Sequence, residues 1–172
     1  GNGQRTIAVV KLIVVSDSAK SVAVLVSGTG TLLRSILDNQ KDRYRVDIVV
    51  ADQICPGIQR AKNVGIRTAV VPMETNRNAW NDKLAAAVAA VDPDIVVSAG
   101  FMRILTPEFC AHYENRLINI HPSILPSFTG LHTHERALEA GCRVAGCTIH
   151  FVTPELDCGP IISQGIVPIL DG

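Results

Sequence analysis

The sequence predicts an α/β fold built on a mostly parallel, twisted sheet with helices on both faces and a Rossmann-like N-terminal half. Short apolar runs alternate with helical stripes along the chain, which is the order of βαβ units. The runs are uninterrupted, as expected of parallel strands that are buried on both faces. Hydrophobic residues make up 47% of the 172 residues, enough for the core of a single domain.

The first half of this domain, residues 21–100, has the pattern of a nucleotide-binding α/β unit. Its first apolar run is followed by a glycine-containing turn and a helical stripe of Leu32, Leu33, Ile36 and Leu37. A later helix is expected to begin at Thr75 and to stop before Asp92-Pro93-Asp94, because proline interrupts a helix. The predicted strands cover 22–26, 46–50, 68–71 and 95–99, and the predicted helices cover 32–37, 56–64 and 75–91.

The second half, residues 101–172, continues the sheet with fewer helices. Asn119 and His121 lie at the end of a predicted strand, and Gly141 follows the end of a predicted helix, where glycine is the usual C-terminal cap. The predicted helices here cover 106–112 and 133–140, and the predicted strands cover 116–120, 146–152 and 160–167.

Residues 1–20 are expected to be a leader or an extra strand, and the sequence does not choose between them. The apolar run Ile7–Val15 is interrupted by Lys11 and is too short to cross a membrane. It also lacks the charged start and cleavage site of a signal peptide. We therefore expect no membrane association.

Charge and cysteine content narrow the class of protein further. Lys plus Arg and Asp plus Glu both number 16, so the chain lacks the net positive charge that nucleic-acid binding requires. The five cysteines are odd in number and form no CxxC pair, which favours a reducing, cytoplasmic location over a disulfide framework or a zinc site.

The turn Ser27-Gly28-Thr29-Gly30-Thr31 lies between a predicted strand and a predicted helix. Backbone N–H groups and the helix dipole at such a place bind phosphate, so a phosphate site is one interpretation and a simple tight turn is the other. The turn lacks the third glycine of a dinucleotide fingerprint and the Gly-Lys-Ser/Thr of a Walker A loop.

Asn119 and His121 are two residues apart, so both side chains are expected on one face at the carboxyl end of their strand. Ligands of open α/β sheets bind at that edge. An amide donor beside an imidazole suits stabilisation of an oxyanion and transfer of a proton, although a satisfied buried pair is the alternative. Asp157, in a turn-rich loop, is either a solvated turn residue or the carboxylate that orients His121.

His132, His134, His150 and Cys147 match no metal-ligand spacing, so we expect no metal. Helix capping and hydrogen bonding to neighbouring residues explain these histidines more simply.

Six segments together resemble the phosphoribosylglycinamide formyltransferases, the folate-dependent formyl transferases of purine biosynthesis. The resemblance runs from about Val22 to Asp171, and methionyl-tRNA formyltransferase and formyltetrahydrofolate deformylase carry different residues at 130–134. The segments are Val-Ser-Gly-Thr-Gly-Thr at 26–31, Ala-Gly-Phe-Met-Arg-Ile-Leu at 99–105, Asn-Ile-His-Pro-Ser-Ile-Leu-Pro at 119–126, Gly-Leu-His-Thr-His at 130–134, His-Phe-Val-Thr at 150–153 and Asp-Cys-Gly-Pro-Ile-Ile at 157–162.

The resemblance implies transfer of a formyl group from 10-formyltetrahydrofolate, the co-substrate, to the amine of 5-phosphoribosylglycinamide in de novo purine biosynthesis. Asn119 and protonated His121 would stabilise the oxyanion, and Asp157 would orient His121. The substrate phosphate would lie on the backbone of Gly30, Thr31 and Leu32. The folate would contact Arg77, Met102, Arg103, Ile104, Leu105, Asn119, Thr153, Pro154, Glu155, Leu156 and Asp157. A monomer or a homodimer is expected.

The chain departs from the family in two places. Leu32 stands where many members have Asn, and the family has further C-terminal helices after the last strand, including a basic residue near the phosphate, that have no counterpart before Gly172. Two other functions therefore stay open: hydrolysis of formyltetrahydrofolate, and a non-catalytic folate- or nucleotide-binding module.

Overall fold

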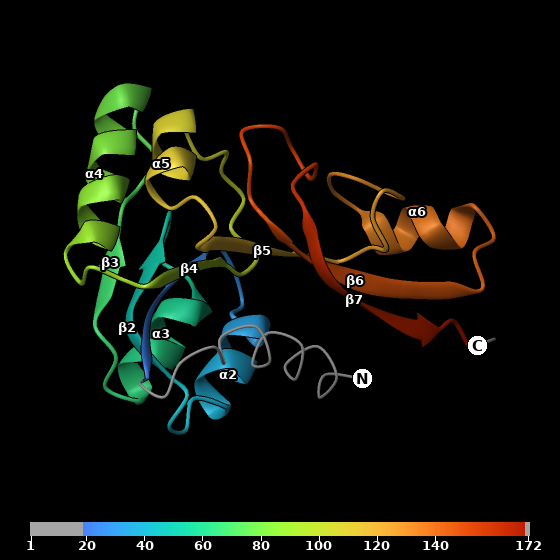
Figure 1. The fold of residues 1–172 in the computed structure, drawn as a ribbon, viewed down its shortest axis with the longest axis horizontal. Helices are drawn as coiled ribbons and strands as arrows, with labels where there is room; N and C mark the ends of the chain where they lie inside the picture. The colour runs from blue at the N-terminus through green and yellow to red at the C-terminus, as the bar shows by residue number, and fades with distance from the viewer. Residues whose placement is uncertain (1–18, 171–172) are drawn as a thin grey trace.

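A computed structural model describes residues 19–170, and the predicted leader or extra strand lies outside this range except for its last two residues. The described residues form one seven-stranded sheet in the order β3-β2-β1-β4-β5-β6-β7 (Figure 1). The α/β class and the mostly parallel sheet predicted from the sequence are confirmed.

The first five strands are parallel, and each apolar run of the sequence forms one of them. Their side chains alternate between the two faces of the sheet, so one strand supplies both halves of the core. The strands are β1 (Lys20–Val26), β2 (Tyr44–Ala51), β3 (Thr68–Val70), β4 (Ile95–Ser98) and β5 (Leu117–His121).

Helices cover the two faces of this parallel part (Figure 1). On one face, α2 (Thr31–Asp38) and α3 (Pro56–Asn63) pack against Val22, Val24 and Val26 of β1. On the other, α4 (Arg77–Ala89) and α5 (Pro107–His112) pack against Ala23 and Leu25 of the same strand. Both clusters exclude water, which is the main source of their stabilisation.

The last two strands turn the sheet antiparallel. β6 (Val144–Phe151) pairs antiparallel with β5, and β7 (Ile161–Pro168) pairs antiparallel with β6. This ribbon extends beyond the other strands in Figure 1, with α6 (Thr133–Glu139) alongside it. β5 runs from Leu117 to His121, one residue later than predicted, so His121 is the last residue of the strand.

The start of α4 corrects a second prediction. Asn76, not Thr75, is the N-cap residue, and its side chain accepts a hydrogen bond from the backbone N–H of Ala79 at 3.1 Å. Threonine and asparagine both cap helices well, so adjacent candidates cannot be separated by residue type alone.

Trp80 holds α4 to the sheet, and its replacement by alanine is expected to lower the free energy of unfolding by about 3–5 kcal/mol. The indole is fully buried, and its Nε1–H donates to the carbonyl of Val71 at 2.8 Å. Urea denaturation measures the loss. Leu138→Ala, at a side chain that is 59% exposed, is the control and should change stability by less than about 0.5 kcal/mol. A similar effect for both variants would contradict this account of the core.

Within residues 19–170, no helix has the length and apolar character needed to span a membrane.

Candidate active site

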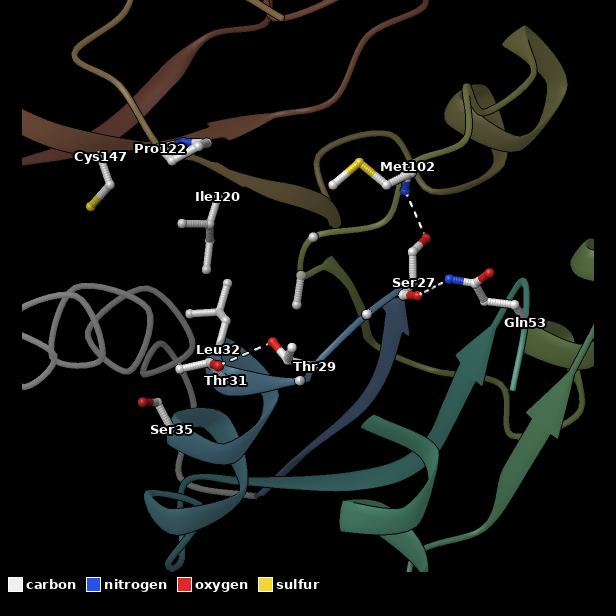
Figure 2. Close-up of a pocket in the computed structure, with 14 residues that line it drawn as sticks. Ser27, Thr29, Thr31, Leu32, Ser35, Gln53, Met102, Ile120, Pro122 and Cys147 are labelled. Carbon is white, nitrogen blue, oxygen red and sulfur yellow. Dashed lines mark hydrogen bonds between the residues drawn. The ribbon is translucent and has the colours of Figure 1, made fainter. Parts of the chain in front are cut away.

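The order of the strands places a crevice at the carboxyl ends of β1 and β4. The chain builds the sheet outward in one direction from β1 through β2 to β3, and in the other from β4 to β5. Ligands of open α/β sheets bind at such a switch point. A pocket of about 540 Å³ opens here (Figure 2). Its lining is Ser27, Gly28, Thr29, Gly30, Thr31, Leu32, Ser35, Gln53, Ala99, Gly100, Met102, Ile120, Pro122 and Cys147.

One wall of the pocket is the turn between β1 and α2. Gly30 is the N-cap residue of α2 in the left-handed conformation, with φ 71°, and the hydroxyls of Thr29 and Thr31 are 3.2 Å apart. Leu32 lies in the first turn of the helix and also lines the pocket (Figure 2). A phosphate site needs a helix N-terminus that faces a pocket, and a simple tight turn does not. This arrangement therefore agrees with the phosphate-site interpretation of the turn.

Gly30→Ala is expected to lower both stability and affinity for a phosphorylated substrate. An added Cβ would lie 2.7 Å from the Cα of Gly57, and the positive φ would strain alanine besides, at a cost of about 1–3 kcal/mol. Denaturation and the KM for the phosphorylated substrate measure the two effects. Gly28→Ala is the matched control for stability, because nothing lies within 4 Å of its added Cβ. Equal stability of the two variants would contradict the prediction.

Asp157 and His121 meet in a buried position near the end of β5. The Nδ1 atom of His121 is 3.5 Å from Oδ1 of Asp157, and the two side chains are 6% and 5% exposed. The Nε2–H of His121 donates to the carbonyl of Phe128 at 2.9 Å. The Nδ1 edge of the ring therefore faces the carboxylate.

Asp157 is held in this place by its own backbone and by a loop contact. Its φ is 53°, in the left-handed region that aspartate and asparagine tolerate better than most residues. Its Oδ2 accepts the backbone N–H of Gly130 at 2.9 Å. The reading of Asp157 as a solvated turn residue is wrong, because its side chain is buried against His121.

Asn119 lies beside a second buried histidine, His150, which is its partner across the β5–β6 pairing. The side-chain Nδ2 of Asn119 and Nε2 of His150 are 3.2 Å apart, and Nδ1 of His150 is 3.0 Å from the carbonyl of Phe151. Because that carbonyl can only accept, Nδ1 is the donor to it, and Nε2 accepts from the Asn119 amide. This bond directs the amide nitrogen of Asn119, which confirms hydrogen bonding to a neighbour as the role of His150.

The pocket and the polar side chains of Asn119 and His121 share strand β5 but lie on opposite faces of it. Ile120 lines the pocket, whereas Asn119 and His121 alternate with it and point to the face covered by α4 and α5. Pro122, directly after His121, also lines the pocket. The strand end is thus the place where a ligand in the pocket comes nearest to the amide and the imidazole.

The Met102–Leu105 segment forms the loop after β4. Met102 and Ile104 are 63% and 69% exposed, whereas Leu105 is buried in the core. Arg77 Nη2 donates to the carbonyl of Ile104 at 3.1 Å, so Arg77 lies against this loop.

The loop Thr153–Asp157 follows β6. Leu156 is 64% exposed, and the hydroxyl of Thr153 donates to the carbonyl of Glu155 at 3.3 Å. Pro154 and Glu155 are exposed as well. The loop folds back tightly at Gly159, where a Cβ would lie 1.7 Å from the carbonyl oxygen of Phe151.

His132 and His134 lie on the exposed side of the site. His132 occupies the N-cap position of α6, but its side chain makes no capping hydrogen bond and is 71% exposed, 3.4 Å from Glu135. The expectation of helix capping is therefore wrong for His132, whose backbone has the positive φ of 54°. In the part of the chain that the structure describes, no three His, Cys, Asp or Glu side chains are grouped so that they could hold a metal ion.

Several partners of the site were not predicted from the sequence: the Phe128 carbonyl, the Gly130 N–H and Asp52. The two backbone groups could not be predicted, because any residue type supplies them. Asp52 could have been noticed, because it is a polar residue directly after a buried strand, as Ser27 is.

Comparison with known proteins agrees with this geometry. Residues 20–172 match the formyl transferase family, so the fold and this match define the chain as a formyl transferase. The chain is 43% identical over 158 residues to phosphoribosylglycinamide formyltransferase of Escherichia coli (strain K12), which covers 88% of this chain and 74% of that protein. The chain belongs to the phosphoribosylglycinamide formyltransferase family.

Two further relatives support this assignment. The phosphoribosylglycinamide formyltransferase of Mycobacterium tuberculosis (strain H37Rv) is 44% identical over 155 residues, covering 88% of this chain and 72% of its own length. Among solved structures, glycinamide ribonucleotide transformylase 1 from Symbiobacterium toebii superposes with a TM-score of 0.86 at 39% identity, covering 91% of this chain and 76% of that one.

Proposed function

We propose that this protein transfers the formyl group of 10-formyltetrahydrofolate to the amine of 5-phosphoribosylglycinamide, a step of de novo purine biosynthesis. The observation that carries the proposal is that half-buried Asn119 lies near the end of β5 on the same face as His121, whose buried side chain meets the buried side chain of Asp157. Identities of 43% and 44% to phosphoribosylglycinamide formyltransferases support the choice of reaction. A cytoplasmic location is part of the proposal.

The reaction needs one new bond and the loss of another. The amine nitrogen attacks the formyl carbon, and the carbonyl electrons move to oxygen to form a tetrahedral oxyanion. The bond from this carbon to N10 of the folate then breaks, N10 takes up a proton, and the amine loses one through water. The energetic difficulty is the negative charge on oxygen, which preorganised donors relieve.

Asn119 and His121 are the donors that the site supplies. The bond to His150 uses one N–H of the Asn119 amide, and the second N–H is the one proposed to meet the oxyanion. In this structure the Phe128 carbonyl accepts from Nε2 of His121 and Asp157 faces Nδ1, so the proposal requires the Nε2–H to turn from that carbonyl to the oxyanion while Asp157 orients the ring. At 3.5 Å the contact of His121 with Asp157 is longer than a hydrogen bond, as catalytic contacts without substrate often are.

The two substrates have different surfaces in this proposal. The phosphate lies on the backbone N–H groups of Thr31 and Leu32 next to Gly30, where Leu32 can serve through its backbone although its side chain is apolar. The folate lies along Met102 and Ile104, and against the Thr153–Asp157 loop, with Arg77 beside it.

The test is a steady-state assay of tetrahydrofolate formation with and without 5-phosphoribosylglycinamide, together with mass spectrometry of the amine product. The proposal expects formation that depends on the amine and an added formyl group on it. A protein that forms no formylated amine would refute it.

Hydrolysis is the second candidate, since formyltetrahydrofolate deformylase from Burkholderia mallei superposes with a TM-score of 0.80 at 28% identity. Formate release at the same rate without amine would favour the hydrolase.

A further inference from the structure

We propose that Asp52 is a positioning residue for the formyl donor, and that it acts by holding the Met102–Leu105 loop in place through Arg103. The inference rests on the proposed function, because the loop matters only if it forms part of the donor surface. Asp52 lies outside the set of Asn119, His121 and Asp157 and touches none of them in the interactions found for residues 19–170.

The carboxylate of Asp52 is buried and accepts one hydrogen bond, from Arg103. The residue directly follows β2, and its side chain is 2% exposed. Its Oδ2 accepts the Nε–H of Arg103 at 2.7 Å, across 51 residues of sequence. Its Oδ1 has no hydrogen-bond partner among residues 19–170.

Such a group is poorly explained by stability alone. Burying a carboxylate costs free energy that one hydrogen-bonded partner does not fully return, and an apolar residue of similar size is often at least as stable. The placement therefore indicates that Arg103 has to be held at this point.

Three consecutive residues of the loop form hydrogen bonds to three different parts of the fold. The backbone N–H of Met102 donates to the hydroxyl of Ser27 at the end of β1, at 2.9 Å (Figure 2). Arg103 donates to Asp52 at the end of β2, and the Ile104 carbonyl accepts from Arg77 on α4. The backbone of the loop is consequently fixed from both sides.

These three hydrogen bonds leave the side chains of Met102 and Ile104 directed away from the core. With the backbone held and Leu105 buried, Met102 and Ile104 remain largely exposed. Two exposed apolar side chains on a fixed backbone offer a preorganised surface for a flat ring, and a loop that is already ordered loses less entropy when the ring binds.

Of these three hydrogen bonds, the one from Arg103 to Asp52 joins a positively charged donor to a negatively charged, buried acceptor. Hydrogen bonds to charged groups are about twice as strong as neutral ones. The bond to Ser27 joins two neutral groups, and the bond from Arg77 has a neutral carbonyl as its acceptor. Asp52 is therefore the residue whose loss should loosen the loop most.

The experiment compares the parent chain with Asp52→Ala and the milder Asp52→Asn, using tetrahydrofolate as the binding probe and the formyl-transfer assay alongside. For Asp52→Ala we expect the Kd for tetrahydrofolate and the KM for the formyl donor to rise at least ~10-fold, with kcat within about twofold, because one charge-assisted hydrogen bond is lost. Asp52→Asn, which keeps an acceptor, should lie in between.

Two further variants separate positioning from a general structural effect. In an Arg103→Ala background, Asp52→Ala should cause no additional loss of tetrahydrofolate affinity. Asp47→Ala is the matched control. It removes another aspartate of β2, whose Oδ1 accepts from Arg45 at 2.6 Å, and should leave donor affinity unchanged.

Donor affinity equal to that of the parent in folded Asp52→Ala overturns the inference. If Asp52→Ala does not fold, an unchanged Kd in Asp52→Asn and in Arg103→Ala overturns it instead. A parent chain that binds tetrahydrofolate without transferring the formyl group refutes the proposed function alone, and the Asp52 comparison is still decided by the Kd values. A parent that does not bind tetrahydrofolate refutes both.

Discussion

Replacing His121 with alanine is expected to lower kcat for formyl transfer by at least ~10²-fold, the usual contribution of a positioned acid–base group. The imidazole is the buried, titratable ring at the end of β5, with Asp157 on one edge and the Phe128 carbonyl on the other. His150 also approaches Asp157, at 3.9 Å, but it lies on β6. Among the histidines of residues 19–170, His121 is the one that contacts Asp157 from β5, the strand of Asn119.

The measurement is the initial rate of tetrahydrofolate formation at saturating concentrations of both substrates. His134→Ala is the control, because it removes an exposed imidazole of the same segment of chain and should retain the parental rate. Comparable thermal unfolding of both variants is required, since His121 is buried. Full activity in folded His121→Ala would eliminate the assigned role.

Asp157→Asn is expected to lower kcat by about 10²-fold with little effect on the KM of either substrate. Asparagine tolerates the φ of 53°, and its side-chain oxygen can still accept from Gly130. What is lost is the carboxylate oxygen facing Nδ1 of His121, which in the proposed mechanism orients the ring. Loss of the carboxylate beside a catalytic histidine has effects of this order or larger in other enzymes.

The pair of kcat and KM values distinguishes this role from a structural one. If the Thr153–Asp157 loop contacts the folate as proposed, a variant that only disturbed this loop would raise the KM for the formyl donor, because Asp157 is the last residue of the loop. A raised KM with an unchanged kcat would show that Asp157 shapes the loop and does not act on His121.

The parallel core was predictable because its strands are uninterrupted apolar runs. β1 and β4 begin and end within two residues of their predicted bounds. The antiparallel direction of β6 was not contained in that pattern, since a buried run of residues carries no information about the direction of its neighbour. Asn76 rather than Thr75 caps α4 because adjacent residues with equal capping ability compete, and the local backbone decides.

The part of the site that lies on a single strand was predictable from the sequence. Asn119 and His121 follow from the two-residue repeat of β5. The position of Asp157 against His121 spans 36 residues, and here the resemblance to formyltransferases supplied what local patterns could not. The contact of Asp52 with Arg103 depends on β2 and β4 flanking β1, which only the assembled sheet reveals.

The most direct test of the account is a double-mutant cycle of His121→Ala and Asp157→Asn, measured as kcat/KM for formyl transfer. If Asp157 acts through His121, the double variant should be no slower than His121→Ala alone, because residues that act as a unit are not additive. If the two losses multiply in the double variant, Asp157 and His121 act independently, and the mechanism proposed for this site is wrong.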